Sequence, residues 1–396
     1  MEINSIQNAF VNALLADATY VDGLAPGGSA LSGTALAEKL SSRLTPDLAK
    51  YLADHFEVIT QKLTQDQTES GFDATVWRSK DDGQVYVSTR GTEGKGDLIA
   101  DADLTTSGLA GWQTLDMVNW WLKSRAPVGT LAAQIKFETV TTPDGTVITT
   151  SYMTAATPVP GDGKLSNVTS VVVNGHSLGG HLSTAFTRLF SDSLPILHTY
   201  TYNSATFNPL SPRRFADFAL AMGLGGAGAT AYPTNGAQTN FHAIHGPDLT
   251  TQNFTLGQIG LRMGLFNEET PVATLDNYST LSNHFMYKMT DALALGNALV
   301  NLGAGVYAGM AMYNDSSYTT GKSAVLKFAS NLTNAITIRN YNEDSAKDSQ
   351  GLKAILGGSV GLTVKYAGGG EKYRTISHEK GCALAVRARI QQHHSL

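Results

Sequence analysis

The chain has 396 residues, enough for one large hydrophobic core or for one core with a smaller appendage. Its net charge of −5 gives no electrostatic reason to expect nucleic acid as a partner. Its single cysteine, Cys382, excludes an intrachain disulfide and a metal site built from cysteines.

The beginning of the chain has the apolar period of a helix, which we expect from Ile6 to Tyr20. It shows no basic region followed by an apolar core, so we expect no cleaved signal peptide. Few charged residues and a lone cysteine suit an exported protein. We therefore predict secretion by a leaderless route, with the cytoplasm as the alternative. The apolar run of about 292–312 is interrupted by asparagines and glycines, and it predicts a buried helix rather than a transmembrane segment.

The next elements are a loop, a helix and a hairpin. Glycine, serine and proline predict a loop from Gly23 to Gly33, and a second helical stretch runs roughly from Pro46 to Gln65. Two alternating segments, 72–77 and 84–88, flank the turn signal Asp81-Asp82-Gly83. They predict a β-hairpin.

The second hairpin strand runs into Arg90-Gly91-Thr92. A strand that ends in this way, before a polar glycine-containing loop, can offer a backbone N–H to an oxyanion, and Thr92 is the candidate donor. The alternative is an ordinary strand-end turn in which Arg90 pairs with Asp97 or Asp101. Taken alone, this motif favours the alternative.

A helix and an insertion follow. Residues Trp112 to Lys123 have helical spacing, and their aromatic and aliphatic stripe predicts core packing: Trp112, Leu115, Val118 and Trp121. The pattern from Ile135 to Tyr152 predicts a hairpin that turns at residues 143–145. This hairpin belongs to an insertion of about 127–168, which we expect to be peripheral.

The most informative stretch is Val171 to Phe190, VVVNGHSLGGHLSTAFTRLF. A run of valines leads into a tight turn centred on Ser177, and an amphipathic helical pattern follows. This is the layout of a nucleophile elbow, the G-x-S-x-G arrangement. Serine is a weak nucleophile that must be presented to a base, and glycines on either side let the strand and helix approach closely. We predict that Ser177 is a nucleophile and that the N–H of Leu178 faces the resulting oxyanion.

Further strands and helices alternate after the elbow. We expect strands at 198–202 and from Asn240 towards Asp248, and helices at 213–220 and from Asn283 through Leu293. Strands that alternate with helices predict an α/β fold with a mostly parallel central sheet and helices on both faces.

A serine nucleophile needs an acid and a histidine, which follow it in that order on this type of fold. Asp248 lies in a loop after a strand, as the acid must. Its rivals Asp192, Asp217 and Asp276 lie at a helix end, inside a helix and in a segment without a preceding strand. His284 is the histidine downstream of Asp248 that stands at a loop-to-helix junction, where the alternative role is helix capping.

Together these residues resemble the class 3 lipase branch of the α/β-hydrolases. The resemblance spans roughly residues 10–295, and the segments that carry it are Ala13–Tyr20, Arg90-Gly91-Thr92, GHSLGG at 175–180, Tyr202-Asn203, Gly246-Pro247-Asp248 and Asn283-His284. It implies an α/β-hydrolase fold, a triad of Ser177, Asp248 and His284, and an oxyanion hole of Thr92 and Leu178. By the same resemblance, Thr105–Trp112 would be the lid; the alternative is the loop 223–236.

The resemblance also implies a domain division and a substrate. Residues 1–314 would form the hydrolase domain and 315–396 a C-terminal extension of unknown role. The substrates would be glycerolipid acyl esters at a lipid–water interface, as for a triacylglycerol lipase or a phospholipase A1. The same elbow serves non-lipid esterases, thioesterases, peptidases and polyester depolymerases, and a non-catalytic lipid-binding protein is the remaining alternative.

Metal ligands are sparse in the sequence. His242-x-x-His245 lacks a recognisable set of further ligands, so we expect no metal or other cofactor, while a structural calcium is left open.

Overall fold

The structure is a computed structural model of the chain. It describes residues 3–64, 70–91, 109–207, 211–223, 231–243, 259–265, 284–301, 336–338, 360–365 and 371–376. Of the predicted site residues, Thr92 and Asp248 lie outside this part of the chain.

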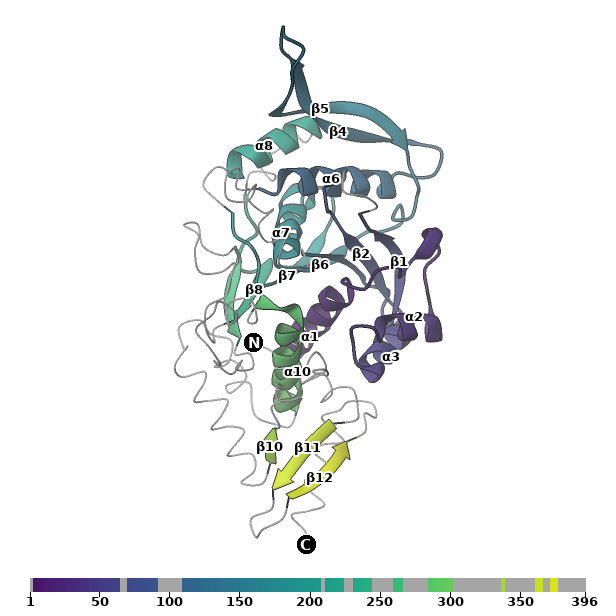
Figure 1. Cartoon of the computed structure of the whole chain (residues 1–396), viewed down its shortest axis with the longest axis vertical. Coiled ribbons are helices and arrows are strands. Elements are labelled where there is room, and N and C mark those ends of the chain that lie inside the picture. Colours follow the sequence, from purple (N-terminus) through teal and green to yellow (C-terminus); the bar gives the residue numbers. More distant parts are fainter. Residues whose placement is uncertain are drawn as a thin grey trace.

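A seven-stranded sheet forms the centre of the molecule (Figure 1). Its strands, in spatial order, are β1 (Phe56–Lys62), β2 (Ala74–Ser79), β3 (Val85–Thr89), β6 (Val171–His176), β7 (Ile196–Tyr202), β8 (Gln238–Ala243) and β9 (Leu261–Leu265). The first three are antiparallel neighbours, and this confirms the hairpin of β2 and β3. From β3 to β9 the neighbours run parallel, so their carboxyl ends lie along the same edge. The predicted mostly parallel sheet is confirmed.

Helices cover both faces of the sheet, as predicted. On one face lie α6 (Gly111–Arg125), α7 (Leu178–Phe190) and α8 (Ser211–Ala221), which share a hydrophobic core with the strands. On the other lie α1 (Ile3–Ala18), α2 (Gly33–Leu40), α3 (Pro46–His55) and α10 (Met286–Asn301). Strand β6 is buried along its whole length because it lies between the two helical layers.

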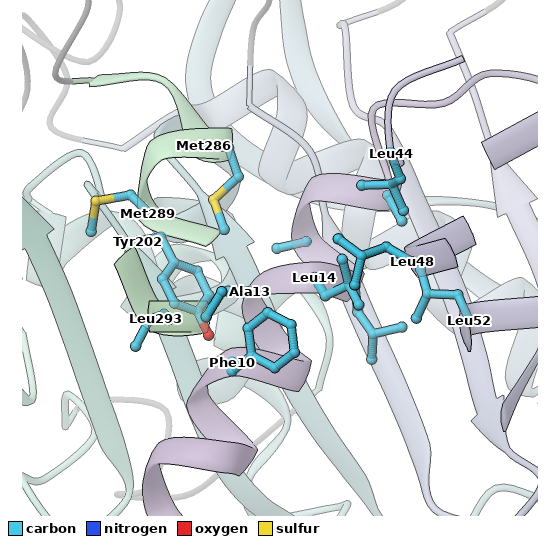
Figure 2. Packing of buried hydrophobic residues seen from close by; sticks show 14 of the residues in the cluster. Phe10, Ala13, Leu14, Leu44, Leu48, Leu52, Tyr202, Met286, Met289 and Leu293 are labelled. Atoms are coloured by element: carbon cyan, nitrogen blue, oxygen red, sulfur yellow. The ribbon is translucent and has the colours of Figure 1, made fainter. Parts of the chain in front are cut away.

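The first helix packs against the last helix of this core (Figure 1). Figure 2 shows Phe10 and Ala13 of α1 beside Leu293 of α10, with Leu48 and Leu52 of α3 on the other side. The apolar face of α1 is therefore covered from two sides.

A buried carboxylate ties these helices together. Asp17 of α1 has no exposed surface; it accepts hydrogen bonds from Arg43 Nε at 2.6 Å and from the Thr290 hydroxyl of α10 at 3.0 Å. Since α10 begins two residues after His284, this contact fastens the segment that carries the histidine to the N-terminal helix.

The hairpin predicted between Ile135 and Tyr152 is present. Strands β4 (Leu131–Thr141) and β5 (Val147–Pro160) pair antiparallel as a separate two-stranded sheet. Asn119 of α6 fastens the hairpin to this helix, because the Asn119 side chain bonds both the N–H and the carbonyl of Ile135 in β4 at 2.9 Å. The distal end extends beyond α6 (Figure 1).

Three short strands belong to the predicted C-terminal extension. β10 (Ile336–Ile338), β11 (Val360–Lys365) and β12 (Glu371–Ile376) form an antiparallel sheet of their own. Within the described part of the chain, no helix is long and apolar enough to cross a membrane.

Two sequence predictions about individual elements are wrong. The helix expected from Pro46 to Gln65 ends at His55, and Phe56–Lys62 is the edge strand β1, whose side chains alternate between buried and half-buried. Trp112, expected in the core, is 49% exposed because it lies at the start of α6 and packs edge-on against Phe137 of the hairpin.

Candidate active site

Ser177 lies at the sharp turn between β6 and α7. Its backbone has φ 58° and ψ −126°, a conformation that side-chain-bearing residues rarely adopt. Such strain costs about 1–3 kcal/mol and persists only where the surroundings enforce it. Here the Ser177 N–H donates to the carbonyl of Tyr202 at 3.0 Å, and its carbonyl accepts from Ala205 at 3.1 Å. The elbow geometry predicted from the motif is present.

The glycines of the motif are required by close packing. A Cβ on Gly175 would lie 2.6 Å from Ser183 Oγ, and one on Gly179 would lie 2.8 Å from the carbonyl carbon of Thr89. The Thr89 hydroxyl also bonds the Gly179 carbonyl, so β3 and α7 are in direct contact. The turn therefore holds Ser177 tightly against its neighbours.

Ser177 and His284 are brought together in the structure. Ser177 Oγ lies 2.7 Å from His284 Nε2, although the two residues are 107 positions apart in the chain. With a neutral imidazole that carries its proton on Nδ1, the serine hydroxyl donates to Nε2. Ser177 is 2% exposed and His284 5% exposed, so bulk water is kept from this hydrogen bond.

A chain of hydrogen bonds links the end of β3 to the main chain of His284. The Gly91 N–H donates to the Tyr20 hydroxyl at 3.2 Å, and that hydroxyl lies 2.7 Å from His176 Nδ1. His176 Nε2 lies 2.6 Å from the carbonyl of His284. Since a carbonyl only accepts, Nε2 carries the proton, and in neutral His176 the Nδ1 atom accepts from Tyr20.

The end of β3 lies directly beside the nucleophile. A Cβ on Gly91 would be 2.9 Å from Ser177 Cβ and 2.5 Å from the His176 carbonyl. Thr92, the predicted oxyanion donor, comes next in the chain but lies outside the described residues. Leu178 is the first residue of α7, and its N–H has no acceptor four residues earlier within that helix.

Arg90 has two acidic partners among the described residues. Arg90 lies 2.6 Å from Asp22 and 3.6 Å from Asp73, and its guanidinium stands 5.5 Å from the centre of the Tyr20 ring. The expected partners Asp97 and Asp101 lie outside the described residues. Sequence reasoning missed Asp22 because it lies 68 positions away, across the fold.

Candidates that the sequence set aside have other contacts. His181 of α7 accepts the Ala110 N–H at 3.3 Å and stacks on Phe207, and burial lowers its pKa to about 3. His198 lies 2.9 Å from the hydroxyl of Thr239.

The acid of the predicted triad lies outside the described residues. β8 ends at Ala243, and residues 244–250, which include Asp248, are among those not described. Of the two predicted lid segments, residues 105–108 and 224–230 also lie outside. Within the described ranges, no group of three or more histidine, cysteine or acidic side chains is arranged to hold a metal ion.

The sheet order and the turn at Ser177 define the class of fold. A mostly parallel sheet with helices on both faces carries a strained serine between a central strand and the following helix. This is the α/β-hydrolase fold that the sequence predicts.

Comparisons with known proteins find similarity to fungal lipases in structure. The Lip2 lipase of Yarrowia lipolytica is 13% identical over 68% of this chain and 80% of its own, with a TM-score of 0.36. The triacylglyceride lipase of Rhizomucor miehei is 13% identical over 72% and 94%, with a TM-score of 0.34. The triacylglycerol lipase of Penicillium expansum is 11% identical over 72% and 90%, with a TM-score of 0.31. No protein-family model and no curated protein sequence matches the chain.

Proposed function

We propose that the protein is a serine carboxylic ester hydrolase in which Ser177 forms an acyl-enzyme. The observation that carries the proposal is the 2.7 Å hydrogen bond between Ser177 Oγ and His284 Nε2 at a strained, buried turn. A strained conformation at a buried serine, aimed at an imidazole, is typical of a nucleophile paired with its general base.

In the proposed reaction, His284 takes the Ser177 proton as the oxygen attacks an ester carbonyl. The oxyanion accepts hydrogen bonds from the N–H groups of Leu178 and Thr92, each typically worth about 10²–10³ in turnover. His284 then gives its proton to the leaving alcohol, and a water molecule that it deprotonates hydrolyses the acyl-enzyme. Asp248 is the proposed acid that orients the imidazole and stabilises its charged form.

The proposed substrates are glycerolipid acyl esters at a lipid–water interface, cleaved as by a triacylglycerol lipase or a phospholipase A1. Support comes from the motif resemblance carried by Arg90-Gly91-Thr92 and by GHSLGG at 175–180. Non-lipid esters and thioesters are the alternative substrates on the same machinery, and lipid binding without catalysis is the alternative function. Leaderless secretion stays the proposed localisation.

A fluorophosphonate probe tests the nucleophile independently of the substrate. We expect wild-type protein to be labelled at Ser177, S177A to be unlabelled, and H284A to be labelled about 10²–10⁴-fold more slowly, the usual contribution of a general base. S183A removes another buried hydroxyl from α7, and H198Q changes a histidine bonded to Thr239; both serve as controls that keep wild-type labelling. Wild-type protein that resists the probe would contradict the proposal.

Substrate class is tested with triolein and phosphatidylcholine, followed by positional analysis of the released fatty acid. Release from either lipid, lost in S177A, supports a lipase or phospholipase. Hydrolysis of p-nitrophenyl butyrate or a thioester, without release from either lipid, would mean that the protein is a non-lipid hydrolase. Every proton transfer proposed here is made by a protein group, so we expect treatment with EDTA to leave the labelling rate unchanged.

A further inference from the structure

The main-chain carbonyl of His284 accepts two hydrogen bonds from side chains at the ends of neighbouring strands. His176, the last residue of β6, donates from Nε2 at 2.6 Å. Asn203, which follows β7, donates from Nδ2 at 3.3 Å. The backbone of the proposed base is therefore held by side chains at the carboxyl ends of β6, the strand of the elbow, and its neighbour β7.

Asn203 also holds the next strand. Its Oδ1 accepts the N–H of Ala243 at 2.9 Å, and its own N–H donates to the carbonyl of Phe241 at 2.8 Å. Ala243 is the last residue of β8, the strand that precedes the loop of Asp248. One carboxamide thus connects the end of β7, the end of β8 and the main chain of His284.

The backbone of Asn203 is itself unusual. Its φ is 42°, and among the described non-glycine residues only Ser177 shares a positive φ. Asparagine tolerates this left-handed region better than most residues. Asn203 has no exposed surface, and its neighbour Tyr202 accepts the N–H of Ser177. The same short segment therefore holds the proposed nucleophile on one side and the proposed base on the other.

We propose that Asn203 is a positioning residue that sets the imidazole of His284 at hydrogen-bond distance from Ser177. The proposal rests on the proposed function, because it assigns a role in that same site. The position needs a donor and an acceptor in one short planar group, together with a positive φ, and asparagine meets all three needs. A catalytic group that is misplaced by about 1 Å can cost about 10²-fold in rate. Loss of the hydrogen bond from Asn203 to His284 should therefore lower the reaction rate of Ser177 measurably.

Two substitutions separate the donor from the rest of the side chain. N203D keeps an acceptor for the Ala243 N–H but replaces the donor to His284 by an acceptor, which repels the carbonyl at 3.3 Å. N203G removes the side-chain hydrogen bonds to His284 and Ala243 and relieves the backbone strain. It is therefore the second test variant, for use if N203D folds poorly. N174D is the matched control: Asn174 is equally buried and donates to Asn12 rather than to His284.

The experiment measures the rate of fluorophosphonate labelling of Ser177, together with kcat and KM on p-nitrophenyl butyrate. We expect N203D and N203G to lower the labelling rate and kcat by about 10–100-fold, with little change in KM, while N174D stays within a few-fold of wild type. Thermal unfolding of each variant confirms that the protein measured is folded.

A pH profile separates positioning from a general structural role. When protonated, the carboxyl group introduced by N203D regains a donor for the His284 carbonyl. The ratio of N203D to wild-type labelling rates should therefore rise as the pH falls through the titration of that group. N203G has no such group, and its ratio should stay constant.

The outcomes distinguish the two proposals. If wild-type protein is not labelled at Ser177, the proposed function fails. If wild-type protein is labelled and folded N203D and N203G react at the wild-type rate, the positioning role is wrong and the proposed function stands. A defect of equal size in N174D would also overturn the positioning role.

Discussion

At the scale of single residues, His181 shows how burial determines a charge state beside the proposed site. It lies four residues after Ser177 on α7 and has no exposed surface. Its Nε2 atom accepts the Ala110 N–H at 3.3 Å, and its ring stacks on Phe207. Burial lowers its pKa from 6.5 to about 3, so the folded protein keeps this imidazole neutral.

This depressed pKa predicts a pH-dependent loss of stability. Between pH 6.5 and about 3 the unfolded chain binds a proton at His181 that the folded protein does not, so stability falls as the pH falls through this range. The slope from this one group approaches about 1.4 kcal/mol per pH unit. H181Q keeps an acceptor near Ala110 but cannot titrate.

The measurement is urea unfolding of wild-type protein and H181Q at several pH values. We expect the two curves of unfolding free energy against pH to diverge below pH 6.5, with H181Q losing less stability. Parallel curves would show that His181 takes up its proton equally in the folded and unfolded states.

At the scale of elements, the elbow depends on how closely β3 and α7 approach. Gly179 lies against the carbonyl of Thr89, where a Cβ would be 2.8 Å from the carbonyl carbon. Since the atoms that a Cβ at Gly179 would meet belong to the backbone of Thr89 and Arg90, a side chain at Gly179 is accommodated only by moving β3 or α7.

We therefore expect G179A to lower the unfolding free energy by about 1–3 kcal/mol, the usual cost of overpacking. The same shift should slow the fluorophosphonate labelling of Ser177, because the turn is displaced from His284. G236A is the matched control, since the nearest atom to a Cβ at Gly236 is the Thr234 hydroxyl at 3.8 Å. Equal melting temperatures for G179A and G236A would contradict the close-packing argument.

Sequence patterns predicted the elements whose signal is local. The elbow followed from glycine spacing between valines and an amphipathic helix, and the hairpin β2–β3 followed from the turn at 81–83. The segment 56–62 was wrongly joined to the preceding helix. No glycine or proline separates it from α3, and its alternating pattern is short.

The supporting residues of the site could not be predicted in the same way. Tyr20 meets His176 across 156 positions, and Asn203 meets His284 across 81. Each lies in a segment that resembles the lipase family, but a pattern within one segment does not reveal its partner in another. The pairing of Ser177 with His284 could be predicted because chain order and the type of junction narrow the histidines to one.

At the scale of the whole molecule, α1 and α10 form one layer with α2 and α3. Asp17 holds them through Arg43 and Thr290; its own side chain has no exposed surface, while that of Arg43 is partly exposed. Hydrogen bonds to a charged group are worth about 1.5–3 kcal/mol each, so this carboxylate stabilises the layer strongly.

We expect D17N to lower the unfolding free energy by about 1.5–3 kcal/mol, because the amide replaces one charged acceptor. D54N is the matched control: Asp54 pairs with Lys50 on an exposed helix surface, where such pairs contribute about 0.3–0.5 kcal/mol. Urea unfolding compares the two, and a D17N effect no larger than that of D54N would mean that the buried carboxylate adds nothing to the layer.

The packing of α1 on α10 also affects how the chain is made. Asp17 leaves the ribosome 273 residues before its partner Thr290. At a synthesis rate of about 5–20 residues per second, α10 follows α1 after on the order of 15–60 s, and until then the apolar face of α1 lacks its covering helix. His284 is synthesised in the same late segment, so a nascent chain that stops before residue 284 has neither α10 nor the proposed general base. The proposed base and the finished N-terminal layer are therefore completed together, after most of the polypeptide has been synthesised.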